Sequence, residues 1–200
     1  MHTDPIFFTS DIHFGHDNCR KWYPQFRPQN TVKEMDEAII ESWNNTVPKD
    51  GVVFFLGDFS LKYGFALDYI PRLNGQILWI PGNHDVFHPR FCHKSKYENR
   101  KSRLKQTSNN LYLYDPSWIL DDVCEDFNFL LCHFPWYTGF DGDKHAEYRP
   151  RREENKGLFL LHGHTHALPE NRLTEDSLSV AWDSWGRVVS LEEILKEIRK

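Results

Sequence analysis

The stretch Gly82-Asn83-His84-Asp85 stands directly after the apolar run Ile77-Leu78-Trp79-Ile80-Pro81. Four apolar residues closed by proline and glycine predict a buried strand that ends in a turn. Ligands of open α/β sheets gather beyond the carboxyl ends of such strands. An amide oxygen can bind a cation, and an imidazole can bind one or move a proton. A polar turn is the alternative meaning of the tetrapeptide, and the other strand ends of the chain decide between the two.

The same pattern, an apolar run followed by aspartate or histidine, recurs four more times. The other runs occupy residues 6–9, 52–56, 127–132 and 158–161. The run at 52–56 is apolar on both faces, which predicts a central strand covered by helices. Each polar residue taken alone could be a turn residue, a helix cap or a satisfied core histidine. Five separate strand ends with the same chemistry instead predict a site at one edge of an α/β sheet.

These strand ends carry seven side chains suited to metal binding, with His84 beside them: Asp11, His13, Asp58, Asn83, His133, His164 and His166. The pairs Asp11/His13 and His164/His166 are each two residues apart, so both members point the same way on an extended chain. Carboxylate, amide and imidazole ligands suit Mn, Fe or Zn. Seven ligands exceed the needs of one ion, whereas two ions about 3.5–4 Å apart that share one carboxylate would use them all. The set contains no cysteine, which excludes a structural zinc knot.

The remaining segments predict one domain over residues 1–200, with irregular excursions near 88–110 and 136–157. Capping boxes at Thr31 and Ser190 each predict a helix start, and apolar spacing predicts a helix over 64–73. Residues 19–30 are expected to be irregular, and 178–182 with 187–189 to form a closing hairpin. Further strands are predicted at 111–114 and 117–122.

Composition limits the function classes. Hydrophobic residues make up 40% and charged residues 26% of the 200 residues, with a formal net charge of -5. The acidic balance argues against a protein that coats nucleic acid non-specifically. The four cysteines have no CxxC spacing, which predicts free thiols in a reducing compartment. The N-terminus lacks the pattern of a signal peptide, and no run approaches the ~18 apolar residues of a membrane span. We therefore expect a cytoplasmic protein that is not bound to a membrane.

In its motifs the chain resembles the calcineurin-like metallophosphoesterase family. The family blocks D-x-H, G-D, G-N-H-[DE], a single H, and G-H-x-H stand here in order as Asp11-Ile12-His13, Gly57-Asp58, Gly82-Asn83-His84-Asp85, His133 and Gly163-His164-Thr165-His166. Together they cover most of the chain. The resemblance implies two facing mixed β-sheets flanked by helices, a four-layer α/β sandwich, with two metal ions at the edge of the sheets.

The resemblance also implies a role for each site residue. One ion would take Asp11, His13 and His166, the other would take Asn83, His133 and His164, and Asp58 would bridge them. Mn is the expected metal, with Fe, Zn or Ni as alternatives. A hydroxide shared by the two ions would attack phosphorus. His84 would be the catalytic residue that assists the leaving oxygen.

Two departures from the family pattern bear on function. Protein phosphatases of the family continue the second block as G-D-x-x-D-R-G, but Leu61 and Lys62 stand at the last Asp and the Arg here. The carboxylate that would orient His84 is therefore missing, and His16 and Asp183 are candidates to replace it. These departures, together with aspartate rather than glutamate at Asp85, argue against a Ser/Thr protein phosphatase.

The expected function is a metal-dependent phosphoester hydrolase, acting as a phosphodiesterase on a nucleotide-like or small phosphoester substrate. His16, Trp136 and Arg149 are candidate substrate contacts. The alternatives are a phosphomonoesterase, a nuclease, or a non-catalytic metal-binding scaffold. The basic run over 90–105 motivates the nuclease, but the acidic net charge makes nucleic acid a possible and not a favoured partner.

Overall fold

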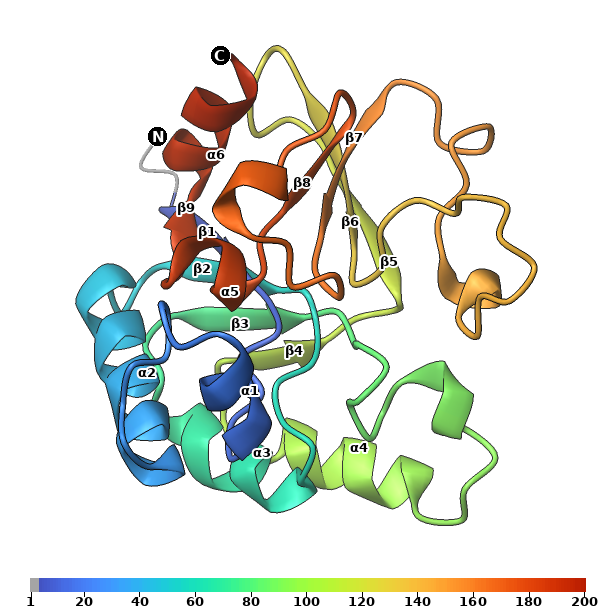
Figure 1. Cartoon of the computed structure of the whole chain (residues 1–200). Coiled ribbons are helices and arrows are strands. Elements are labelled where there is room, and N and C mark those ends of the chain that lie inside the picture. Colours follow the sequence, from blue (N-terminus) through green and yellow to red (C-terminus); the bar gives the residue numbers. More distant parts are fainter. Residues whose placement is uncertain (1–3) are drawn as a thin grey trace.

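The computed structural model describes residues 4–200 and contains two mixed β-sheets that face one another (Figure 1). The first sheet has the order β4-β3-β2-β1-β9, with β1 to β4 parallel and β9 antiparallel. Its strands are β1 (Ile6–Thr9), β2 (Val52–Phe55), β3 (Gln76–Trp79), β4 (Leu111–Leu113) and β9 (Val189–Ser190). The second sheet has the order β5-β6-β7-β8, and only β5 runs antiparallel. Its strands are β5 (Ser117–Leu120), β6 (Asn128–Cys132), β7 (Leu158–His162) and β8 (Ser177–Ser179).

Side chains that alternate along the strands build the core in layers, since successive residues of a strand point to opposite faces. On β1, Phe7 joins the cluster beneath the helices, whereas Phe8 joins the cluster between the two sheets. On β6, Phe129 faces the first sheet, while Leu130 faces outward into a third cluster with Trp136. The expectation of two facing mixed sheets flanked by helices is therefore confirmed.

Helices cover one outer face of this sandwich (Figure 1). The α-helices are α1 (Asp17–Trp22), α2 (Val32–Thr46), α3 (Tyr63–Tyr69), α4 (Tyr97–Lys105), α5 (Trp182–Trp185) and α6 (Leu191–Ile198). The 3₁₀ turns are η1 (Ile70–Arg72), η2 (Pro89–Phe91), η3 (Ala146–Tyr148) and η4 (Pro169–Asn171). Helices α2, α3 and α4 pack on the first sheet, and α6 packs along the cluster between the sheets. The outer face of the second sheet is covered by the segment 134–158 and not by an α-helix.

Three segments differ from the sequence expectation. Residues 19–30 are not wholly irregular, because α1 extends to Trp22. The excursion over 88–110 contains α4, whose single buried side chain, Leu104, is 0% exposed. The helix expected over 64–73 is divided into α3 and η1, and Pro71 lies in η1, where its missing N–H is tolerated.

The predicted closing hairpin is wrong. Residues 177–179 form β8 of the second sheet, whereas 189–190 form β9 of the first. Between them lies α5, which ends at Gly186 in the left-handed conformation (φ 71°). The chain thus crosses from one sheet to the other here, and α5 brings Asp183 close to the end of β1.

The capping box at Ser190 is confirmed and leads to a pH prediction. The Glu193 carboxylate accepts hydrogen bonds from the main chain of Ser190 and from the Arg187 guanidinium. Hydrogen bonds from Arg187, with those from Ser190, lower the pKa of Glu193 from 4.5 to about 2 despite partial burial. A lowered carboxyl pKa stabilises the fold above pH 4.5, and this stabilisation is lost as the pH falls towards about 2.

We therefore expect Glu193→Gln to lower the free energy of unfolding near neutral pH. The loss should be roughly 0.5–1 kcal/mol, because solvent screens a pair of which Glu193 is 37% exposed. Urea unfolding at several pH values between about 7 and 3 would measure it. The difference in unfolding free energy between the variant and the original protein should become smaller below pH 4.5. A difference that stays constant with pH would show that the Glu193 charge does not stabilise the fold.

No helix within residues 4–200 is long and apolar enough to cross a membrane. Residues 1–3, where the expectation about a signal peptide begins, lie outside the described residues. All four cysteines, which lie inside the described range, have free thiols, as their spacing predicts.

Candidate metal centre

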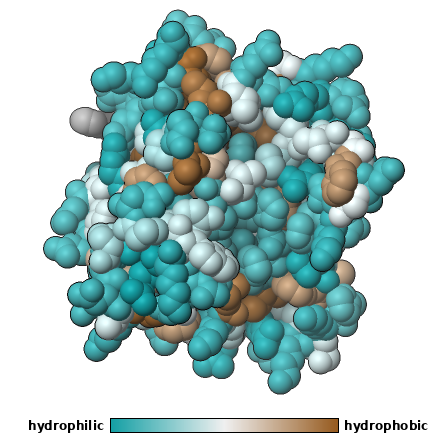
Figure 2. Space-filling model, in the orientation of Figure 1, coloured by the Kyte–Doolittle hydropathy of each residue, from teal (hydrophilic) through white to brown (hydrophobic). Residues whose placement is uncertain are grey.

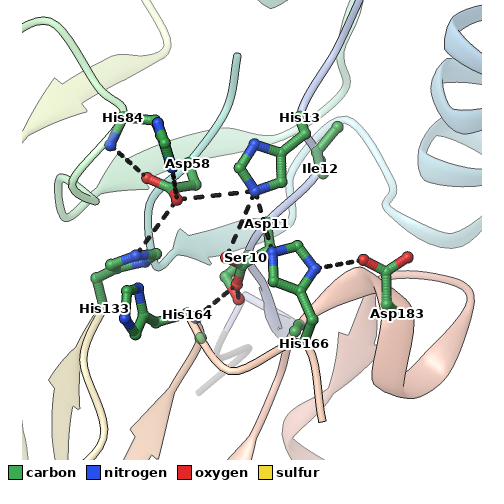
Figure 3. Close-up of polar contacts among 12 residues, drawn as sticks. Ser10, Asp11, Ile12, His13, Asp58, His84, His133, His164, His166 and Asp183 are labelled. Atoms are coloured by element: carbon green, nitrogen blue, oxygen red, sulfur yellow. Dashed lines mark hydrogen bonds and ion pairs between the residues drawn. The ribbon is translucent and has the colours of Figure 1, made fainter. Parts of the chain in front are cut away.

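The loops that follow β1, β2, β3, β6 and β7 meet at one edge of the two sheets, and the space-filling view shows a hollow with hydrophilic walls near the middle of this face (Figure 2). The hollow lies where these loops come together because parallel strands end on the same side of a sheet. All seven predicted metal ligands come from these loops, and Figure 3 shows all of them but Asn83 as labelled side chains. The structure thus brings the sequence-predicted ligands together.

Two groups of potential ligands share one carboxylate. Asp11, His13 and His166 form the first group, and Asp11, Asp58 and His133 form the second; within each group the ligand atoms lie within 4.8 Å of one another. Asp58 Oδ2 lies 3.7 Å from His13 Nε2 of the first group and 3.5 Å from His133 Nε2 of its own group, so this oxygen is close to a histidine of each group. Such a carboxylate position is what two adjacent cations require.

Asn83 and His164 complete the second group. Asn83 Oδ1 lies 3.1 Å from His133 Nε2 and 2.9 Å from His164 Nδ1. His133 Nδ1 must donate its proton to the carbonyl oxygen of Leu56, 2.8 Å away, because that oxygen can only accept. The lone pair of Nε2 then faces the amide oxygen, which is also an acceptor. Two converging acceptors favour a cation between them.

Asp11 provides the sharpest test of whether a cation fits. Its Oδ2 accepts hydrogen bonds from Ser10 Oγ (2.5 Å) and from the main-chain N–H of His164 (2.9 Å). Its Oδ1 is buried and has no hydrogen-bond partner among the residues described. This oxygen lies 3.6 Å from His166 Nε2 and 3.8 Å from His13 Nε2. A buried carboxylate oxygen without a partner is costly, and a bound divalent cation would satisfy it.

The pKa shifts of the site residues also favour a bound cation. Burial, followed by repulsion from Asp11 and Asp85, raises the pKa of Asp58 well above its ordinary value. Burial lowers the pKa of His13 and of His133. The three buried carboxylates Asp11, Asp58 and Asp85 thus disfavour one another's ionised forms, and a divalent cation would relieve this repulsion.

The backbone of the site is strained. Within residues 4–200, six non-glycine residues have a positive φ, and five of them are predicted ligands: Asp11, His13, Asp58, His164 and His166. The left-handed region costs roughly 1–2 kcal/mol for most residues, and such strain concentrates at functional sites. Two glycines allow the loops to approach the Asp58 and Asp11 carboxylates closely. A Cβ on Gly82 would lie 2.2 Å from Asp58 Oδ1, and a Cβ on Gly163 would lie 2.3 Å from Asp11 Oδ2.

Comparisons with known proteins identify this arrangement. A model of the family described as "Calcineurin-like phosphoesterase" matches residues 4–168. The chain belongs to the calcineurin-like phosphoesterase family. It is 32% identical over 206 residues to the Gene 66 protein of Mycobacterium phage L5, a match that spans 94% of this chain and 91% of the relative. The Gene 66 protein of Mycobacterium phage D29 is 30% identical over 94% of this chain and 93% of that protein.

A solved structure supports the fold. The protein of unknown function AQ665 from Aquifex aeolicus aligns with a TM-score of 0.69 and 22% identity, covering 98% of this chain and all of the other. Membership in the family makes this chain a metal-dependent phosphoesterase, and its two Asp/His groups supply residues for the metal.

Asp85 joins two of the loops that carry predicted ligands, a role that does not follow from the sequence motifs. Its carboxylate accepts hydrogen bonds from the main-chain N–H groups of Gly82, Asp58 and Phe59 and from Trp79 Nε1, at 2.8 to 3.0 Å. The turn after β3 is thereby tied to the turn after β2.

A second pair of unpredicted contacts orients His166. Asp183 Oδ2 lies 2.6 Å from His166 Nδ1, so Nε2 is turned towards Asp11. Arg27, only 1% exposed, donates to both carboxylate oxygens of Asp183 and to the main-chain carbonyls of Asp11 and Ile12. Asp183 therefore orients His166, a predicted ligand, and not His84, for which the sequence makes it a candidate. Carboxylate contacts of this kind raise ligand basicity and fix the ring.

We expect Asp183→Asn to weaken metal binding by about 10–100-fold, the usual effect of removing such a support. Asparagine keeps one oxygen for Arg27 but loses the charge that faces His166. Titration of the metal-free protein with Mn by calorimetry would measure the change. Unchanged affinity would show that His166 needs no support or does not bind the metal.

His84 and the substrate candidates lie around the hollow. His84 Nε2 is 3.9 Å from Asp58 Oδ2, its side chain is 48% exposed, and its main-chain N–H donates to Asp58 Oδ1. His16 caps α1 and lies against Trp22 and His13, with no contact to His84. No carboxylate among the described residues hydrogen-bonds the His84 ring, which instead packs edge-on against the His13 ring, with 5.6 Å between the ring centres.

The other two candidates line a cavity of about 580 Å³ beside His164. Trp136 is 4% exposed and serves largely as core under the second sheet. The guanidinium of Arg149 forms an ion pair with Asp143 and donates to the carbonyl of Pro135. Sequence analysis did not select His145, which also lines this cavity and whose ring centre lies 5.5 Å from that of His164.

Proposed function

We propose that this phosphoesterase hydrolyses phosphodiesters of nucleotide-like substrates with two divalent ions, Mn in the first place. The observation that carries the proposal is the position of Asp58 Oδ2 near both His13 and His133, which belong to two ligand groups that share Asp11. Asp11, His13 and His166 would hold one ion, and Asn83, His133 and His164 the other. The bound ions would supply positive charge for the phosphate and a water of lowered pKa.

His84 acts on the leaving side in this proposal. Burial, followed by the charge of His133, lowers the pKa of His84 to about 4, so the ring is neutral near pH 7. A neutral imidazole can still donate a hydrogen bond through its remaining N–H. We infer that His84 stabilises the negative charge that develops on the leaving oxygen, because its half-exposed ring can reach a substrate in the hollow.

The diester preference rests on space and charge. The cavity beside His164 has room for a second esterified group, and its walls include the aromatic Trp136 and Phe140 together with Lys144 and His145. Apolar walls with a few polar groups are typical of pockets for small organic ligands. A monoester would leave this cavity unused.

The test is Mn-dependent hydrolysis of bis-p-nitrophenyl phosphate beside p-nitrophenyl phosphate, which share one leaving group. We expect a higher kcat/KM for the diester. A higher value for the monoester would make the protein a phosphatase, and hydrolysis of neither with Mn, Fe, Zn or Ni would favour a non-catalytic scaffold.

A further inference from the structure

Arg90 is held at the rim of the metal centre by three contacts. Its guanidinium donates to the main-chain carbonyl of Asn83 over 3.4 Å, and its main-chain N–H donates to His88 Nδ1 over 3.2 Å. Its guanidinium carbon lies 4.9 Å from the centre of the Phe91 ring. His88 is fully buried, which anchors the turn that carries Arg90. The exposed arginine is thus tied to Asn83, whose amide oxygen reaches His133 and His164.

The charge of Arg90 is not neutralised by the protein. Arg27 pairs with Asp183 and Arg149 pairs with Asp143. No carboxylate among residues 4–200 lies within ion-pair distance of Arg90, and only one of its guanidinium N–H groups has a protein acceptor. A guanidinium held in place with free N–H groups is well suited to a phosphate, which it can bind through two parallel hydrogen bonds.

The surroundings of Arg90 are also cationic. It begins a run of seven lysine and arginine residues that extends to Lys105 and contains one acid, Glu98. In a chain of net charge -5, this rim is where further negative charge on a substrate would be stabilised.

We propose that Arg90 binds a second phosphate of the substrate, next to the phosphate held at the metal centre. The substrate class is then a phosphodiester with a neighbouring phosphate, as in a nucleotide bisphosphate or a nucleic-acid strand. The inference rests on the proposed function, because it needs one phosphate at the metal ligands. It assigns to Arg90 the role that the sequence offered to Arg149, whose charge is neutralised by Asp143.

The test compares two product-like ligands on the Mn-loaded protein by calorimetry. Thymidine 3′,5′-bisphosphate should bind at least about tenfold more tightly than thymidine 5′-monophosphate, since a charge-assisted hydrogen bond contributes about a factor of ten or more. Arg90→Ala should reduce this advantage to about twofold or less and leave monophosphate affinity unchanged. Arg90→Lys should retain part of it, because lysine keeps the charge but not the planar fork.

Arg100→Ala is the matched control, because Arg100 belongs to the same basic run but packs over Tyr63. Arg100→Ala should leave the roughly tenfold tighter binding of the bisphosphate unchanged. Metal content of each variant, measured by mass spectrometry, should remain that of the original protein. If Arg90→Ala weakens both ligands equally, or if the original protein shows no preference for the bisphosphate, the second phosphate site is refuted.

Failure of the proposed function would look different: the original protein would bind neither ligand and hydrolyse no diester, which would overturn both proposals. The two sources of the second phosphate are separated with 5′-phosphorylated oligothymidylates. Affinity that rises from two to eight nucleotides points to a strand that follows the basic run. Affinity that is constant over this range points to a small nucleotide, and either result supports the Arg90 site.

Discussion

Asp58→Asn should lower kcat for a phosphodiester by about 10³-fold or more, because it removes the carboxylate oxygen that lies near both His13 and His133. The metal-free variant should nevertheless unfold at a higher temperature than the metal-free original protein. Burial, together with Asp11 and Asp85, raises the pKa of Asp58, so its ionised form destabilises the fold at any pH above the ordinary value of 3.8. Asparagine removes this charge and tolerates the left-handed backbone at φ 60°.

Steady-state hydrolysis of bis-p-nitrophenyl phosphate measures the loss of kcat, and thermal unfolding with and without Mn measures the change in stability. The original protein should gain stability on adding Mn, and the variant should gain much less. Asp122→Asn is a matched control, because Asp122 is exposed and also has a positive φ of 57°. Full activity of Asp58→Asn, or a metal-free variant less stable than the original, would contradict the assignment.

His84→Ala should lower kcat by about 10²–10³-fold, the usual effect of removing one hydrogen-bond donor aimed at developing charge. Metal content should remain unchanged, since neither of the two ligand groups includes His84. The loss should be larger for a diester with an alkoxide leaving group than for a p-nitrophenyl ester, because the poorer leaving group carries more negative charge and depends more on the donor.

Steady-state kinetics on the two esters, with His93→Ala as control, would test this. His93 is an exposed histidine in the 88–110 excursion, and its replacement should leave both rates unchanged. Equal losses on the two esters would assign His84 to phosphate binding in place of leaving-group stabilisation, and loss of bound metal would make it a ligand.

The predicted metal ligands can be found in the sequence because they stand just after apolar strands. The patterns around Asp11, Asp58, Asn83, His133 and His164 are local, and parallel pairing brings the ends of their strands together. The same local logic located the helix starts at Thr31 and Ser190, where both capping boxes form.

The supports of the site could not be predicted this way. Arg27 and Asp183 are 156 positions apart, and neither belongs to a recurring pattern. Asp183 also lies beyond residue 168, where the match to the family ends. Their pairing depends on α5, which lies where the chain crosses from β8 in one sheet to β9 in the other. Short strands choose their partners through such long-range packing, and an adjacent pair with a glycine turn resembles a hairpin equally well.

The excursions were harder to interpret for a related reason. Seven basic side chains lie between residues 90 and 105, where α4 packs against the core through the buried Leu104 and the partly buried Tyr97. Two apolar contacts in a basic stretch give little hydrophobic periodicity from which to predict a helix. The difference between Arg149 and Arg90 likewise depends on whether a carboxylate lies nearby in space, as Asp143 does for Arg149.

The central claim is a centre of two ions that share Asp58, and metal titration tests it most directly. The metal-free protein would be titrated with Mn while bound metal and bis-p-nitrophenyl phosphate hydrolysis are measured on the same samples. We predict two equivalents of Mn per chain, with hydrolysis that appears as the second equivalent binds. Full hydrolysis at one equivalent, or hydrolysis independent of metal, would contradict the account.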